Sequence, residues 1–157
     1  MKLFQLIKSN SVRLNLDSKD KSDVINELVD ILKDDSRVTN LTKVRSAVQD
    51  REKITSTGVG KGVAVPHGKT DGVNEDIVVL ARTDEGIDFD SHDAQPVFLF
   101  FLLIGKMDSA IRHLKLLSRI AKMMDNPARV EAIKSAKSAE EIISLIEDFE
   151  KDLDEIA

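Results

Sequence analysis

The sequence predicts one α/β domain in which helices cover a small sheet. Segments with helical spacing of apolar residues are interleaved with a few strand-like runs, which is the pattern of this fold class. We find no internal repeat and no linker within the 157 residues, so we expect residues 1–157 to form a single unit. A chain of this length buries roughly 70% of the surface that its unfolded form exposes, and it needs no disulfide for stability.

The first two helices are predicted in the N-terminal third of the chain. Apolar residues recur at helical spacing in segment 18–34, and Ser18 or Asp20 is a suitable N-cap. A second helix is expected over 41–51, with Asn40 as its N-cap and an inward face formed by Leu41, Val44 and Val48.

The middle of the chain predicts strands. Glycines 58, 60 and 62 end helical character, and a short extended segment over 62–65 leads to Pro66. Segment 76–82, DIVVLAR, is rich in β-branched residues and is expected to be a strand. The run VFLFFLLIG at 97–105 is apolar without interruption, which favours a strand that is buried on both faces in the middle of the sheet.

Three further helices are expected in the C-terminal third. The first covers 108–125, with Asp108 or Ser109 as its cap, and ends at Asn126. Pro127 suits the first turn of a short helix to about residue 136. The last helix begins at Ser138, which has the capping-box spacing to Glu141.

Composition excludes several functional classes. The chain contains no cysteine, so disulfides, thiolate nucleophiles and sulfur-bound zinc are excluded. The net charge of −5 argues against a general nucleic-acid binder, because affinity for the phosphate backbone needs clustered lysine and arginine. No apolar run approaches the ~20 residues that span a bilayer, and the N-terminus lacks a signal-peptide pattern. We therefore expect a cytoplasmic protein without membrane insertion.

The glycine-rich segment 57–72, TGVGKGVAVPHGKTDG, contains a Gly-Lys-Thr that could belong to a nucleotide-binding loop. A Walker A loop requires its first glycine at position 63, where the chain has Val63, and Gly62 is one residue too early. The loop must also open a helix, but a turn-like Asp-Gly-Val-Asn follows Thr70. The spacing therefore argues against binding of a phosphate by backbone amides at this segment.

His67 is the strongest candidate in the same segment. Pro66 restrains the chain before it, and Gly68 permits a sharp exit, which would hold one imidazole exposed at the end of a short strand. The alternative interpretation is that Pro-His-Gly is simply a turn. His113 shares a helical face with Leu116 and Ile120, so it is either a packed core histidine or a neutral donor to a phosphoryl oxygen.

A metal centre is a remote alternative, and it would make the protein a metal-dependent hydrolase. Such a site would combine His67 and His113 with Asp71 or Asp90, but the chain has no local pair of ligands to anchor it. His92 lies among turn residues and is expected to be an exposed loop histidine. Neither a metal nor a cofactor is therefore predicted.

Segment 51–68, REKITSTGVGKGVAVPHG, resembles the phosphorylation-site region of the fructose/mannitol-type enzyme IIA domains. These domains belong to the bacterial phosphoenolpyruvate-dependent phosphotransferase system (PTS). The resemblance continues through VFLFFLLIG, HLKLLSRIAKMM and SAKSAEEIISLIEDF, and covers about residues 18–149. It implies an enzyme IIA type-2 domain with a mixed sheet of about five strands, flanked by helices on both faces.

The resemblance also implies roles for individual residues. His67 matches the histidine that is phosphorylated, His113 matches the second active-site histidine, and Arg51 matches the arginine beside the phosphoryl group. The roles implied for His113 and Arg51 are to stabilise that group. Lys69 is either a further cation for the phosphoryl group or a solvated lysine beside a turn.

The implied activity is a phosphoryl relay. An HPr-type phosphocarrier protein would supply the group to His67, and no nucleotide, metal or organic cofactor is implied. The group would then pass to the IIB domain of a fructose or mannitol permease, or phosphorylation would act as a switch on regulated target proteins, as in the nitrogen-regulatory branch. The absence of fused domains favours the regulatory branch. One segment departs from the family pattern: residues 105–112, GKMDSAIR, carry basic residues where many relatives have an acidic or polar stretch. The preference of this protein among partner proteins therefore stays open.

Overall fold

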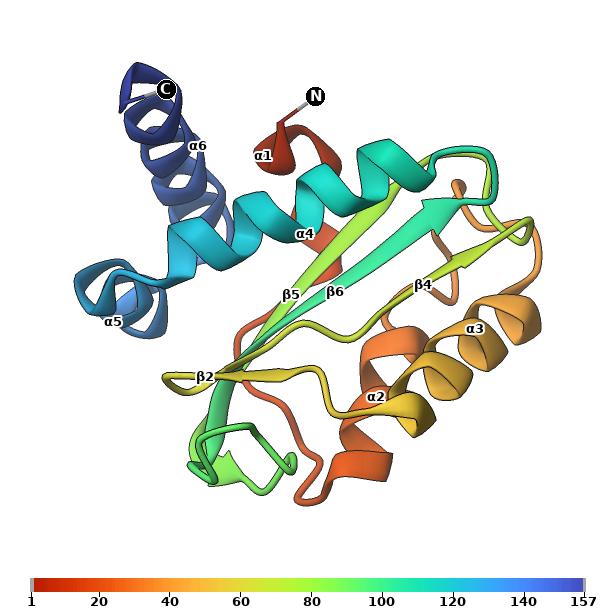
Figure 1. Ribbon diagram of the computed structural model, residues 1–157, viewed down its shortest axis with the longest axis horizontal. Helices are drawn as coiled ribbons and strands as arrows, with labels where there is room; N and C mark the ends of the chain where they lie inside the picture. Colours follow the sequence, from red (N-terminus) through yellow and green to blue (C-terminus); the bar gives the residue numbers. More distant parts are fainter. Residues whose placement is uncertain (1, 157) are drawn as a thin grey trace.

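The computed structural model describes residues 2–156, and its helices pack on both faces of a mixed sheet (Figure 1). The helices are α1 (Leu3–Leu6), the 3-10 helix η1 (Ser9–Ser11), α2 (Lys21–Asp30), α3 (Leu41–Ile54), α4 (Ala110–Met124), α5 (Pro127–Ser135) and α6 (Ala139–Ile156). The strands are β1 (Val12–Arg13), β2 (Gly58–Gly60), β3 (Val63–Ala64), β4 (His67–Thr70), β5 (Ile77–Ile87) and β6 (Val97–Lys106).

Strand β6 is the centre of the sheet, as its unbroken apolar sequence predicts. The strand order is β1-β5-β6-β3-β2, and β4 also pairs with β6, beyond β3 along the same edge. Strand β5 runs antiparallel to β6, whereas β3 and β4 run parallel to it, so the sheet is mixed. The α/β fold class with helices on both faces is confirmed, with six strands in the sheet.

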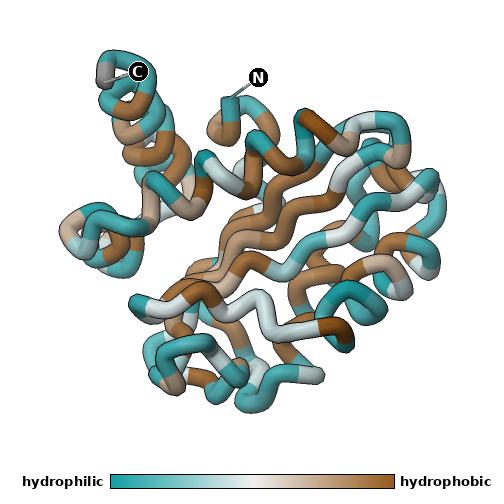
Figure 2. The backbone as a smooth tube through the Cα atoms, viewed as in Figure 1, coloured by the Kyte–Doolittle hydropathy of each residue, from teal (hydrophilic) through white to brown (hydrophobic). Residues whose placement is uncertain are grey.

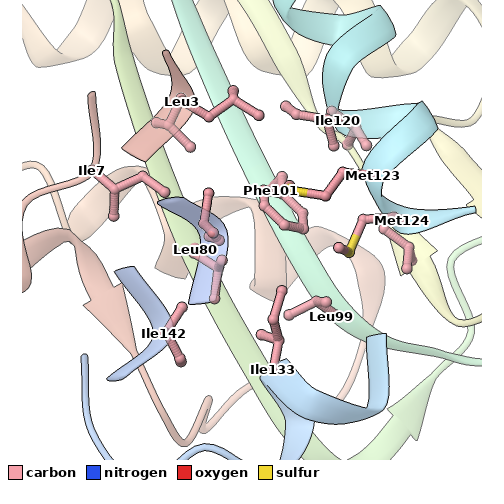
Figure 3. Close-up of a cluster of buried hydrophobic side chains, with 14 of the residues drawn as sticks. Leu3, Ile7, Leu80, Leu99, Phe101, Ile120, Met123, Met124, Ile133 and Ile142 are labelled. Atoms are coloured by element: carbon pink, nitrogen blue, oxygen red, sulfur yellow. The ribbon is translucent and has the colours of Figure 1, made fainter. Parts of the chain in front are cut away.

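Two apolar clusters fill the space between the sheet and its helices. Alternate residues of β5 and β6, including Leu80 and Phe101, face a cluster formed with α1, α4, α5 and α6 (Figure 3). Their neighbours, including Val79 and Phe100, face a second cluster formed with α2 and α3. Because side chains alternate along a strand, both faces of the central strands are apolar. Figure 2 shows this hydrophobic stretch of chain between the helices.

Most element boundaries follow the local signals in the sequence. The Asp20 carboxylate accepts from the Asp23 N–H at the start of α2, and the Asn40 side chain accepts from the Lys43 N–H at the start of α3. Strand β5 extends five residues beyond the predicted end at residue 82, and α2 ends earlier than predicted. The short N-terminal elements α1, η1 and β1 were not predicted, since each is too short to carry a periodic pattern.

The cap of α6 differs in detail from the predicted capping box. The Ser138 hydroxyl accepts from the Glu141 N–H at 3.1 Å, as expected. The Glu141 carboxylate, however, accepts from the N–H of Lys137 at 2.8 Å, one residue before Ser138. No helix within residues 2–156 combines the length and apolar composition that a membrane crossing requires.

The prediction of a sharp exit at Gly68 is wrong, because the chain continues as strand β4. Residues His67–Thr70 pair with Leu103–Lys106 of β6, and this pairing keeps them extended. A glycine is needed at position 68 for another reason. A Cβ there would lie only 3.0 Å from the backbone carbonyl carbon of Ala47 in α3. The missing side chain therefore allows α3 to pack closely on β4 beside His67.

Candidate active site

The structure brings His67 and His113 together although they lie far apart in the sequence. His67 is the first residue of β4 and is paired with Leu103 of β6. After β6 the chain enters α4, the helix that contains His113 and covers one face of the sheet (Figure 1). The two ring centroids are 5.5 Å apart, and the ring planes are tilted by 51°. Because His67 and Gly68 begin a strand paired with β6, Pro-His-Gly is not a simple turn.

The backbone fixes which nitrogen of His67 carries the proton. Nδ1 lies 2.8 Å from the carbonyl oxygen of Val65, and a carbonyl can only accept, so Nδ1 is the donor. In the neutral ring, Nε2 then keeps its lone pair and is the nucleophilic nitrogen. Burial lowers the pKa of His67 below its ordinary value, an effect opposed by the Val65 hydrogen bond and reinforced by the charge of Arg51. The half-buried ring therefore stays neutral at physiological pH.

His113 is the more buried of the two rings, at 7% exposure. Its Nδ1 lies against Gly105, where a Cβ would come within 2.5 Å of that nitrogen. Within residues 2–156, Nδ1 of His113 has no hydrogen-bond partner. A proton at Nδ1 would be a buried donor without an acceptor, so we place the proton on Nε2. His113 thus has one N–H available for donation, as expected for a ring whose neutral form is favoured.

Protonation of His113 should weaken the fold below neutral pH. Burial, followed by the positive charges near the ring, lowers the pKa of His113 from 6.5 to about 4. The unfolded chain therefore binds more protons than the folded chain between these values, and stability is lost as the pH falls through this range. The unfolding free energy, measured by urea unfolding, should fall between about pH 7 and about pH 4 in the parent protein. We expect this fall to be smaller in His113→Gln, which has no group that titrates at this position. An equal loss in both proteins would contradict this assignment.

Two cations accompany the histidines. Arg51 lies in the last turns of α3, and its Nη1 donates to the Thr55 carbonyl at 3.0 Å. Lys69 is exposed on β4, two residues after His67 and therefore on the same face of the strand. Its charge contributes to the low pKa of His113. The site thus combines one neutral nucleophile with donors suited to an anionic group.

Sequence reasoning missed three parts of the site. These are the Val65 carbonyl that fixes the tautomer of His67, the close approach of Gly105 to His113, and the buried carboxylate of Glu52. Only Glu52 left a signal in the sequence, as the acidic residue directly after Arg51. The other two depend on backbone geometry, which residue types do not reveal.

The third histidine and the two aspartates of the alternative metal centre have other surroundings. His92 is exposed in the loop between β5 and β6, as predicted. Asp71 is paired with Lys43 at 3.1 Å, and Asp90 lies 3.8 Å from Lys21. Among the residues that the structure describes, no group of three or more His, Asp or Glu side chains is placed to hold a metal ion.

Comparisons with known proteins identify the family of the chain. Residues 5–149 match the family model described as phosphoenolpyruvate-dependent sugar phosphotransferase system, EIIA 2. The chain is 32% identical to the PTS fructose-specific EIIABC component of Bacillus subtilis over 151 residues. This match covers 96% of the chain but only 24% of that relative, so the chain spans about a quarter of its length.

Solved structures show the same fold. The nitrogen regulatory protein IIA-Ntr from Neisseria meningitidis superimposes with a TM-score of 0.85 at 29% identity, covering 91% of this chain and 97% of that one. The enzyme IIA of the mannitol system of Escherichia coli, in complex with phosphorylated enzyme IIB, gives a TM-score of 0.76 at 23% identity, covering 91% and 99%. With the family model matching most of its length, the chain belongs to the EIIA type 2 family of the phosphoenolpyruvate-dependent sugar phosphotransferase system.

Proposed function

We propose that this protein is a phosphoryl carrier that accepts a phosphoryl group on Nε2 of His67 from the phosphohistidine of an HPr-type protein. The hydrogen bond between Nδ1 of His67 and the Val65 carbonyl carries the proposal. It leaves Nε2 unprotonated on a ring that burial keeps neutral. A neutral imidazole nitrogen is a good nucleophile at physiological pH, and its bond to phosphorus is labile enough to be broken again.

The transfer is a balanced displacement at phosphorus. The Nε2 lone pair of His67 forms the new N–P bond while the N–P bond to the donor histidine breaks, and the electron pair returns to the donor ring. Negative charge is spread over the equatorial oxygens, so catalysis depends on position and charge stabilisation. The N–H of His113 and the guanidinium of Arg51 are suited to donate to these oxygens once Arg51 leaves the Thr55 carbonyl.

The surface around the site suits a protein donor. Exposed large apolar side chains lie on the elements that carry or border the two histidines: Ile54 at the end of α3, Val59 in β2, Met107 before α4, and Ile111 and Leu114 on α4. Exposed apolar side chains beside a site are available for contact with a partner protein. Such a surface supports brief docking of a phosphorylated carrier.

The next step has two candidate forms. In the transport form, His67 passes the group to a IIB domain, and the fold shared with the enzyme IIA that was solved in complex with phosphorylated enzyme IIB favours this form. In the regulatory form, phosphorylation switches the binding of target proteins, and the likeness to a nitrogen regulatory protein IIA-Ntr favours it. Because the site chemistry is the same in both forms, we propose the relay itself and leave the acceptor to experiment.

Incubation with phosphoenolpyruvate, enzyme I and a purified HPr-type carrier tests the proposal. Intact mass spectrometry should show the addition of one phosphoryl group, and only when the carrier is present. Adding a purified IIB domain should then remove the group if the transport form holds. The phosphorylated protein should remain unchanged with IIB if the regulatory form holds. No phosphorylation with any HPr-type carrier would contradict the proposal.

A further inference from the structure

Glu52 is a buried carboxylate next to the candidate site, although it does not contact His67. It lies in α3 directly after Arg51, and its side chain is only 5% exposed. A buried carboxylate is costly unless several donors satisfy it.

Three donors converge on this carboxylate. The N–H of Thr57 donates to it at 2.8 Å, and the hydroxyl of Thr57 donates to its other oxygen. Nζ of Lys21 lies 3.0 Å from the carboxylate, and is itself held by the Phe89 carbonyl at 3.3 Å and above the Phe89 ring at 4.7 Å. Glu52 thereby ties the loop after α3 to the start of α2.

Thr57 continues this set of contacts towards the histidine. Its carbonyl accepts from the N–H of Val65 at 2.9 Å, and the carbonyl of Val65 accepts from Nδ1 of His67 at 2.8 Å. Thr57 and Val65 thus connect the buried carboxylate to the ring nitrogen that must carry the proton. Every step is a hydrogen bond between residues that are buried or half-buried.

We propose that Glu52 is a positioning residue for His67, acting through Thr57 and Val65 to hold the Nδ1–H tautomer that leaves Nε2 free. A histidine ring without this restraint can carry its proton on either nitrogen, and the Nε2–H form is not a nucleophile at Nε2. The position of the Val65 carbonyl therefore determines the fraction of molecules in which His67 is the Nδ1–H tautomer, the form that can react at Nε2. Thr57 lies in the loop between α3 and β2. Among residues 2–156, Glu52 is the buried charged residue that binds this loop.

The tautomer can be measured without any phosphoryl transfer. Ring nitrogen shifts of His67 from ¹⁵N NMR should report the Nδ1–H form in the parent protein at about pH 7.5, where the ring is neutral. In Glu52→Ala we expect a substantial fraction of the Nε2–H form. Glu52→Gln should recover most of the parent signature, because its amide can accept from the Thr57 N–H and donate to the Thr57 hydroxyl.

The consequence for phosphoryl transfer rests on the proposed function. We expect the rate of transfer from an HPr-type carrier to fall by about 10- to 100-fold in Glu52→Ala, the size of effect that misplacement of a reacting group produces. Glu52→Gln should recover most of the rate. If the parent protein is not phosphorylated, the proposed function fails, whereas the tautomer measurement still tests the role of Glu52.

Asp35 offers a matched control. Its carboxylate is buried to a similar degree, accepts from the Arg37 N–H at 2.9 Å and pairs with the Arg37 guanidinium at 2.7 Å, but lies in the loop between α2 and α3. Asp35→Ala and Glu52→Ala should both lower the unfolding temperature, but Asp35→Ala should leave the tautomer and the transfer rate unchanged. Equal effects of both substitutions on the tautomer would overturn the proposal, since the effect would then be general.

Thr57→Val keeps the proposal testable if Glu52→Ala does not fold. It removes the hydroxyl that donates to Glu52 while retaining the volume and the N–H of the residue. We expect an intermediate shift of the tautomer signature and an intermediate loss of rate. A parent-like tautomer in whichever of these two variants folds would overturn the proposal.

Discussion

Replacement of His67 by alanine is expected to abolish phosphorylation and leave the fold intact. Nε2 of His67 is unprotonated, because Nδ1 of the same ring carries the proton and donates it to the Val65 carbonyl. His113 cannot take over, because its proton lies on Nε2 and its remaining nitrogen faces Gly105. The measurement is intact mass after incubation with phosphoenolpyruvate, enzyme I and an HPr-type carrier, together with thermal unfolding of the variant.

His92→Ala is the matched control for this substitution. It removes an exposed histidine from the loop before β6 and should leave phosphorylation unchanged. If His67→Ala were phosphorylated to the level of the parent protein, another residue would be the acceptor. The assignment of the site would then be wrong.

Replacement of His113 by alanine is expected to slow phosphoryl transfer without removing the acceptor. The ring of His113 lies 5.5 Å from that of His67, and under the proposed function its Nε2–H donates to the oxygens of the transferring group. Losing one such preorganised donor costs roughly 10²- to 10³-fold in rate in comparable sites. The variant should therefore reach full phosphorylation, but only over much longer times.

Rapid-quench kinetics with a phosphorylated carrier measure this effect. His113→Gln retains an N–H donor and should be slowed less than His113→Ala, provided that the donor explains the effect. Equal rates for the alanine variant and the parent protein would show that His113 serves packing alone. Its burial beside Leu116 would then be its whole role.

Much of the fold could be predicted because its signals are local. The caps at Asp20 and Asn40 depend on one side chain and a backbone N–H three residues away. The apolar run of β6 predicts a central strand, because only a central strand buries both faces. The face of α4 that carries Leu116 and Ile120 likewise predicted that His113 would border the core.

The remaining features depend on contacts between distant segments. Pro-His-Gly continues into a strand because β6 supplies its hydrogen-bonding partners, and no local rule shows this. The short helix α1 exists because the Glu150 carboxylate in α6 accepts from the N–H groups of Leu3 and Phe4. The tautomer of His67 depends on the carbonyl of Val65, a residue whose own N–H is hydrogen-bonded to Thr57 across the loop.

The central claim is that Nε2 of His67 carries the phosphoryl group while Nδ1 keeps its proton and its bond to Val65. NMR of the phosphorylated, ¹⁵N-labelled protein tests this directly, through the coupling between phosphorus and the ring nitrogens. We expect coupling to Nε2 of His67 and a protonated Nδ1. Coupling to Nδ1, or to a nitrogen of His92 or His113, would contradict the claim.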